Sequence, residues 1–157
     1  MADNKEVAML FDSSHCTGCR GCQVACKQWN MLPSKMGLND NEFTGSLQGP
    51  GDLGGDTRLV MTFDEKPSDN KLQPIHWAIG RRSCFHCTDA GCVAICSSGA
   101  LKKNDNGVVS FDTEKCNGCT YCQSACPFDV PRFRDTDGKI DKCTLCLDRL
   151  EEGQIPA

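Results

Sequence analysis

The stretch CNGCTYCQSACP, residues 116–127, determines what the rest of the chain can be. Its cysteines follow the spacing C-x2-C-x2-C-x3-C, and proline comes directly after the last of them. Three thiolates spaced two residues apart on a tight loop can converge on one iron-sulfur cubane. The fourth thiolate, three residues further along a beginning helix, points away and in two-cluster ferredoxins binds the other cluster. The spacing therefore predicts [4Fe-4S] clusters.

The rest of the chain contains three more cysteine blocks related to this one. Residues 16–26, CTGCRGCQVAC, repeat the same spacing, so the first and third blocks form an internal repeat. The second block has a wider middle gap, and the fourth has only its first two cysteines. Gly18 and Gly118 occupy equivalent places and suit a loop that turns backbone N–H groups toward cluster sulfurs. The candidate ligands are Cys16, Cys19, Cys22, Cys26, Cys84, Cys87, Cys92, Cys96, Cys116, Cys119, Cys122, Cys126, Cys143 and Cys146.

Zinc and disulfides are the other uses of dense cysteine, which here makes up 14 of 157 residues. Zinc ribbons use C-x2-C pairs, but a tetrahedral site has no use for a third cysteine two residues further on. A disulfide framework would need partners at Cα separations that cysteines this close together cannot all reach without strain. Iron-sulfur ligation is the interpretation that uses every spacing.

The distribution of apolar residues and the net charge indicate where the protein is located and which partners it can bind. The chain shows no apolar run long enough for a signal peptide or a membrane span. We therefore expect a cytoplasmic location by default, with periplasmic export alongside a signal-bearing partner as the alternative. A net charge of -4 argues against a nucleic-acid partner, which a basic surface would attract.

Short strands are expected around the cysteine blocks. Residues 100–103 and 108–112 are predicted to be two strands joined at Asn106-Gly107, the pair preferred in type I′ hairpin turns. A second hairpin is expected in residues 128–142 with Asp137-Gly138 at its turn. Residues 27–83 contain no cysteine and many glycines, and we interpret them as an insertion whose hairpin, strands 59–63 and 75–79, faces a partner. The expected fold class is α+β: tandem ferredoxin-like modules with short strands, short helices and this Gly-rich insertion.

Four motifs carry a resemblance to a known family. They are CxGCxxCxxACK in the first block, CxHC in the second, CPFxVPR after the third and KCxLCxDRxxxGxxPA in the fourth. The chain resembles the four-cluster iron-sulfur subunit of molybdenum or tungsten bis-pterin oxidoreductases. CKQWN at residues 26–30 and GDLGGDTRLVM at residues 51–61 are most similar to the formate dehydrogenase beta subunit. Ser97 departs from the pattern, since the family usually has proline there.

The resemblance implies how the cysteines pair. One inner cluster would be held by Cys84, Cys87, Cys92 and Cys126, and the other by Cys116, Cys119, Cys122 and Cys96. An outer pair would use Cys16, Cys19 and Cys22 for one cluster and Cys143, Cys146 and Cys26 for another, each lacking one cysteine. The family pattern thus has four clusters, of which this chain fully ligates two. The implied domains are an inner module at 84–126, an outer module at 1–26 and 127–157, incomplete at its C-terminus, and the insertion.

Family members place the third cysteine of the last block directly after the Pro-Ala with which this chain ends. We therefore expect the native polypeptide to continue with a cysteine after Ala157 and another about four residues later, following the x3 spacing.

The implied function is electron transfer between a molybdenum or tungsten pterin catalytic subunit, that of formate dehydrogenase, and a downstream membrane cytochrome or other acceptor. The chain alone is not expected to be an enzyme, since no catalytic residue set is found. The alternatives are the same role in a polysulfide, sulfoxide or nitrite system, an iron-sulfur sensor, and a zinc-stabilised interaction module.

Three polar residues next to candidate ligands have two interpretations each. Lys27 and Lys142 can offset cluster charge or simply be solvated. His86 can donate an N–H to a cluster sulfur or serve packing.

Overall fold

The computed structural model describes residues 6–33 and 47–157. Residues 1–5 and 34–46, which belong to the expected outer module and insertion, lie outside the described residues. The described elements are α1 (Gly21–Trp29), β1 (Val60–Pro67), β2 (Ile75–Arg82), α2 (Gly91–Ala94), β3 (Leu101–Lys103), β4 (Val109–Phe111), α3 (Tyr121–Ser124), β5 (Arg132–Phe133), β6 (Ile140–Asp141) and α4 (Leu147–Glu151). Short helices and small antiparallel sheets give the mixed α+β character expected of a ferredoxin-type domain.

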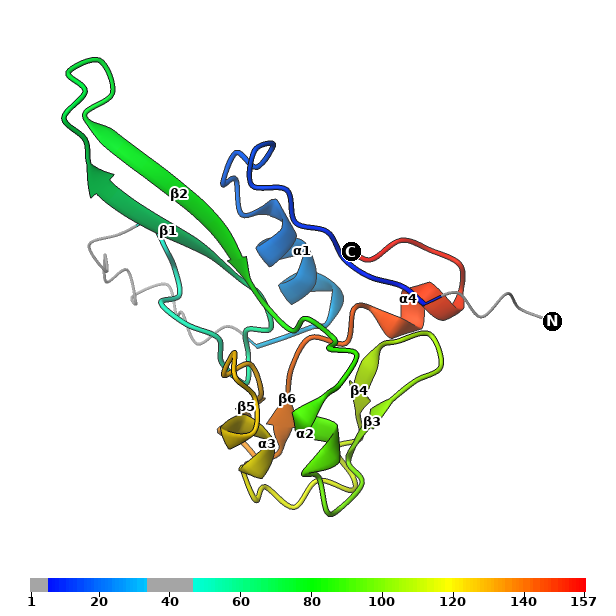
Figure 1. Ribbon diagram of the computed structural model, residues 1–157. Helices are drawn as coiled ribbons and strands as arrows, with labels where there is room; N and C mark the ends of the chain where they lie inside the picture. The colour runs from blue at the N-terminus through cyan, green and yellow to red at the C-terminus, as the bar shows by residue number, and fades with distance from the viewer. Residues whose placement is uncertain (1–5, 34–46) are drawn as a thin grey trace.

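Strands β1 and β2 form a long antiparallel arm that projects from the rest of the molecule (Figure 1). The predicted hairpin at 59–63 and 75–79 is confirmed, but the pairing runs further, from Val60 opposite Arg82 to Pro67 opposite Ile75. Only the base of β1 is buried, whereas its outer half is exposed. The polar outer half gave no period-2 signal from which its length could have been predicted.

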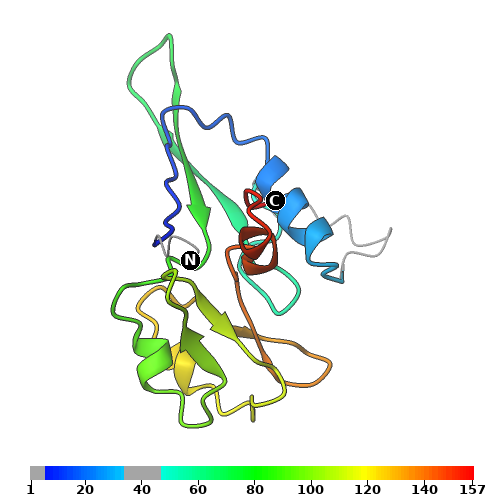
Figure 2. The same cartoon turned by 90° about the vertical axis from the view of Figure 1, so that its right-hand side faces the viewer.

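Helices α2 and α3 lie beside the two short hairpins, β3–β4 and β5–β6, at the opposite end from the arm (Figures 1 and 2). Their shared core contains Leu101, Val109, Cys122 and Ile140, all buried. Alternation along β3 and β4 places Leu101 and Val109 on one face. Cysteine side chains form part of this core, so the apolar clusters are small.

Both predicted hairpins are present, although one turn differs from the prediction. Gly107 has a φ of 84° and donates its N–H to the carbonyl of Asn104, while Asn106 is not among the described residues with positive φ. A type I′ turn needs positive φ at both central residues, so that prediction was wrong. The second hairpin has Gly138 in the left-handed region at its turn, with a φ of 65°.

Helices α1 and α4, from opposite ends of the chain, lie side by side (Figures 1 and 2). The indole N–H of Trp29 in α1 donates to Asp148 in α4 at 2.8 Å, and the Arg149 guanidinium lies 4.4 Å from the Trp29 ring centroid. The two helices are thereby joined through side chains.

A buried ion pair connects α1 to β6. Arg58 donates to both carboxylate oxygens of Asp141, at 2.5 and 3.1 Å, and a further Arg58 nitrogen donates to Asn30. The Asn30 side-chain amide in turn donates to the carbonyl of Cys26 at 2.8 Å. This network fixes the C-terminal end of α1 next to the strand that leads into the last cysteine block.

The hairpin β5–β6 packs against the hairpin β3–β4. Phe133 and Ile140, from β5 and β6, pack in the core shared with β3 and β4. The hairpin that follows the third block therefore lies against the inner cysteines, since Phe133 and Ile140 line one cavity with four of them. None of the helices in the described ranges 6–33 and 47–157 has the length and apolar character needed to cross a membrane.

Candidate metal centres

Each of the four cysteine blocks turns through the same backbone conformation. The second residue after the first cysteine has positive φ in every block: 68° at Gly18, 50° at His86, 73° at Gly118 and 54° at Leu145. The backbone N–H groups of Gly18, His86 and Leu145 each donate to the sulfur of the cysteine two positions earlier, at 3.4 Å. The loop thus orients sulfurs with main-chain hydrogen bonds, which bias a cluster's potential.

Gly18 and Gly118 both have the positive φ expected of such a loop, but His86 and Leu145 were missed in this role. Both have side chains and still take the left-handed conformation, which costs a non-glycine residue free energy. Equivalence in block spacing, rather than residue type, was the signal that could have identified them.

Four cysteines from two blocks line one cavity, named here pocket A. They are Cys84, Cys87, Cys92 and Cys126. Cys84 is positioned at the end of β2 and Cys92 by helix α2, while Cys126 follows α3. These four are the set that the family resemblance implied for one inner cluster.

A second cavity, named here pocket B, is lined by the other four inner cysteines. They are Cys96, Cys116, Cys119 and Cys122. The N–H of Ile140 in β6 donates to the Cys116 sulfur at 3.4 Å, and Leu101 and Phe133 close the cavity with apolar side chains. Each pocket takes three cysteines from one block and the fourth from the other.

The remaining cysteines are brought together in part. Cys26, Cys143 and Cys146 are all buried and lie close enough for their charges to interact, and they are named here site C. Cys19 and Cys22 are exposed and Cys16 is partly buried, on the loop that leads into α1. Within the described ranges, no three His, Cys, Asp or Glu side chains meet closely enough to hold a single metal ion.

Burial makes several of these thiols hard to ionise. Desolvation, followed by the neighbouring Cys143 and Cys146, raises the pKa of Cys26 to about 11. Desolvation, followed by Cys119, Cys92 and Cys96, raises the pKa of Cys122 to about 11. A cluster requires thiolates, so iron binding must release protons from these sites.

The His86 ring is buried between the second block and strand β4. Its Nδ1 accepts the Val109 N–H at 3.0 Å, which places the proton of the neutral ring on Nε2. Burial, together with the positive charges of Lys142 and Arg81, lowers the pKa of His86 to about 3. Among the residues the structure describes, Nε2 has no hydrogen-bond partner. The ring therefore packs against β4 and keeps one unused donor.

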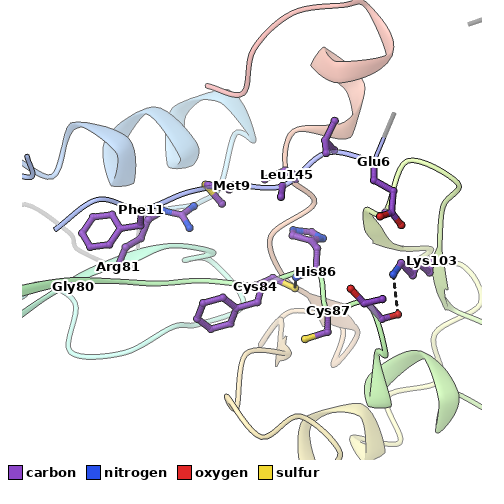
Figure 3. A pocket seen from close by; sticks show the side chains of 15 residues that line it. Glu6, Met9, Phe11, Gly80, Arg81, Cys84, His86, Cys87, Lys103 and Leu145 are labelled. Carbon is purple, nitrogen blue, oxygen red and sulfur yellow. Dashed lines mark hydrogen bonds between the residues drawn. The ribbon is translucent and has the colours of Figure 1, made fainter. Parts of the chain in front are cut away.

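A groove of about 830 Å³ lies over this histidine (Figure 3). The N-terminal segment 6–11 forms one wall with Met9 and Phe11, and Arg81, His86 and Leu145 line it from the other elements. Its cysteines, Cys84 and Cys87, also belong to pocket A. The groove therefore adjoins one wall of pocket A but does not itself contain a four-cysteine set.

The two lysines next to ligand cysteines differ in environment. Lys27 is part-exposed and contacts the carboxylate of Asp56 at 3.4 Å. Lys142 is buried and lines pocket A together with its four cysteines. The interpretation of Lys142 as a solvated side chain is therefore wrong.

Comparison with protein families identifies the chain. A family described as a 4Fe-4S dicluster domain matches residues 75–157, more than half of the chain. The chain belongs to this 4Fe-4S dicluster family. The cofactor expected from the cysteine spacing, the [4Fe-4S] cluster, is thereby confirmed.

Individual relatives of this dicluster protein are subunits of oxidoreductase complexes. The formate dehydrogenase-O iron-sulfur subunit of Escherichia coli is 43% identical over 98% of this chain and 49% of its own length. The thiosulfate reductase electron transfer subunit PhsB of Salmonella typhi is 35% identical over 97% of this chain and 69% of its own. The B subunit of the anaerobic dimethyl sulfoxide reductase of Escherichia coli is 34% identical over 96% and 66%.

The chain spans about half the length of the formate dehydrogenase relatives. Their names confirm the resemblance drawn from the sequence motifs, because they describe iron-sulfur and electron-transfer subunits rather than stand-alone enzymes.

Proposed function

We propose that this dicluster protein is the electron-transfer subunit of a formate dehydrogenase built around a molybdenum or tungsten pterin catalytic subunit. The observation that carries the proposal is the pair of four-cysteine cavities, each drawn from two blocks. A [4Fe-4S] cluster bound in such a cavity takes up and gives back one electron at a time. The protein supplies ligands, spacing and a fixed electrostatic environment.

Ligand roles follow from the lining of each cavity. Cys84, Cys87, Cys92 and Cys126 hold one cluster in pocket A, and Cys96, Cys116, Cys119 and Cys122 hold another in pocket B. Site C supplies three ligands of a third, and the first block supplies Cys16, Cys19 and Cys22 to a fourth. The chain thus forms tandem ferredoxin-like modules, an inner one around pockets A and B and an outer one around α1 and α4.

The order of the sites supports passage of electrons along a row. Cys143 of site C lies close enough to Cys84 of pocket A for their charges to interact, and Cys92 of pocket A is similarly coupled to Cys122 of pocket B. Apolar side chains around the inner pockets exclude water, which raises the effect of every nearby charge on a cluster.

The partner is a pterin-bearing catalytic subunit, with a membrane cytochrome or another acceptor downstream, in the cytoplasm or co-exported to the periplasm. The 43% identity to formate dehydrogenase subunits favours formate over the alternatives. The thiosulfate and dimethyl sulfoxide reductase relatives support a second candidate function, that of an electron-transfer subunit in a sulfur-compound reductase.

A double-variant experiment tests the cross-block ligation. Iron per chain is counted after anaerobic reconstitution of Cys84→Ser, Cys126→Ser and the double variant. If both cysteines serve one cluster, the double variant loses no more iron than Cys84→Ser alone, the non-additivity expected of coupled sites. Cys84→Ser combined with Cys122→Ser is the matched control and should lose two clusters. The assignment would be contradicted if iron loss were additive for Cys84→Ser with Cys126→Ser but not for Cys84→Ser with Cys122→Ser.

Co-purification tests the partner. The tagged chain, expressed anaerobically in its source, should retain a pterin-containing subunit, and the complex should oxidise formate with an artificial acceptor. Recovery of a pterin subunit that turns over thiosulfate or a sulfoxide but not formate would establish the second candidate instead.

A further inference from the structure

Lys142 is a buried cation without a carboxylate partner. It lies directly after β6, is 2% exposed, and its ammonium donates to the backbone carbonyls of Val109 at 2.5 Å and Cys143 at 2.9 Å. The neighbouring carboxylate, Asp141, forms its ion pair with Arg58. Among the residues that the structure describes, no acidic side chain forms an ion pair with Lys142.

Burying an ammonium against neutral carbonyls alone is unfavourable, because a desolvated charge needs an opposite charge nearby. The groups that can supply one are the cysteines of pocket A, whose cavity Lys142 lines. Its positive charge lowers the pKa of Cys84 and of Cys92, against the larger effect of burial, which raises both. The ammonium therefore lies beside the sulfur ligands that pocket A offers.

The ammonium is held by two backbone carbonyls, one of them in strand β4. Its acceptor Val109 lies in β4, where the same residue donates its N–H to His86 of the second block. The second acceptor is the carbonyl of Cys143, a cysteine of site C. Lys142 thus lies between pocket A and site C, away from solvent.

We propose that Lys142 is a tuning residue that raises the reduction potential of the cluster in pocket A. The inference rests on the proposed assignment of pocket A as a cluster site. Adding an electron makes a thiolate-ligated cluster more negative, and a fixed positive charge in a dry cavity stabilises that reduced state.

A second lysine in the chain provides the matched control. Lys115 precedes Cys116 as Lys142 precedes Cys143, so both stand directly before the first cysteine of a block. The Lys115 side chain, however, is 63% exposed and contacts Asp112 at 3.3 Å. Proximity in sequence is therefore the same for the two lysines, whereas burial differs.

The test is a redox titration followed by electron paramagnetic resonance on the full chain with anaerobically reconstituted clusters. The variants are Lys142→Met, which keeps length without charge, Lys142→Arg, which keeps charge, and Lys115→Met. In Lys142→Met the reduced-to-oxidised ratio of one cluster should fall at least tenfold at fixed potential, which for a one-electron couple is about 59 mV toward more negative values. Lys142→Arg and Lys115→Met should stay close to the wild type.

Iron and sulfide counts separate this inference from the proposed function. Lys142→Met with full iron content and an unchanged potential would overturn the tuning role and leave the ligand assignment intact. If Lys142→Met loses iron, Lys142→Arg decides: retention of the cluster at the wild-type potential supports a role for charge. Loss of iron in both variants would show that the shape of the side chain matters and would overturn the inference.

Discussion

Replacing Gly118 by alanine tests whether the cysteine loops need glycine for conformation alone or also for space. Gly118 has a φ of 73°, and a Cβ added there would lie 2.9 Å from the carbonyl oxygen of Gly138, a distance that real Cβ atoms essentially never show. The left-handed conformation costs an alanine about 1–2 kcal/mol. The clash with a backbone atom adds about 1–3 kcal/mol, because neither loop can move without displacing pocket B.

Gly99 is the matched control, since it has a φ of 65° but no atom within 4 Å of an added Cβ. Gly99→Ala should therefore show the conformational cost alone. Cluster release makes unfolding irreversible, so the rate is the quantity to measure, by loss of the clusters' visible absorption in anaerobic urea. Gly118→Ala should unfold about tenfold faster than Gly99→Ala, the factor that corresponds to about 1.4 kcal/mol. Equal rates for the two variants would refute the steric part of the reasoning.

Three further outcomes are expected. Arg58→Met should destabilise the folded chain by about 3–5 kcal/mol, because it leaves the Asp141 carboxylate buried without its partner, and should therefore speed the loss of cluster absorption in anaerobic urea. Return of the rate toward the wild-type value on adding Asp141→Asn to Arg58→Met checks the cause. Trp29→Ala should increase amide exchange in α4 about tenfold by removing the hydrogen bond to Asp148, whereas Trp77→Ala, on the distant arm, should leave α4 unchanged in hydrogen-exchange mass spectrometry. Chelation of iron should abolish near-ultraviolet circular dichroism, because the small apolar cores cannot fold the chain without the binding energy of the iron-sulfur clusters. A retained signal would show that the apolar core folds the chain by itself.

The family resemblance implied the partition of the inner cysteines, and the same two sets line pockets A and B. Three thiolates on one tight loop can face one cavity, and the helix that follows carries the fourth away, as Cys126 is carried to pocket A. The hairpins were also predictable, since Gly107 and Gly138 mark their turns. These features depend on short stretches of chain, whose conformational preferences follow from residue type and spacing.

Other features depended on the fold as a whole and could not be predicted. Lys27 and Lys142 look alike in the sequence, each beside a ligand cysteine, yet one reaches solvent and the other is buried beneath β4. Burial of a side chain is decided by segments distant in sequence, here Val109 and the second block. The positive φ at Leu145 likewise could not be predicted from residue type, because among residue types glycine is the one that signals a positive φ.

The exchange of fourth cysteines between pockets A and B has a consequence for assembly. Pocket B joins Cys96 to the block that begins at Cys116, and pocket A joins Cys92 to Cys126, so filling either pocket closes the loop between the second and third blocks. Closing a loop of about 20 residues costs roughly 3 kcal/mol of chain entropy, and the first cluster to enter bears that cost for both. The second pocket is then already formed, so its occupancy follows the first. Maturation of the inner pair should therefore be cooperative, with partly loaded chains scarce at every stage of iron delivery.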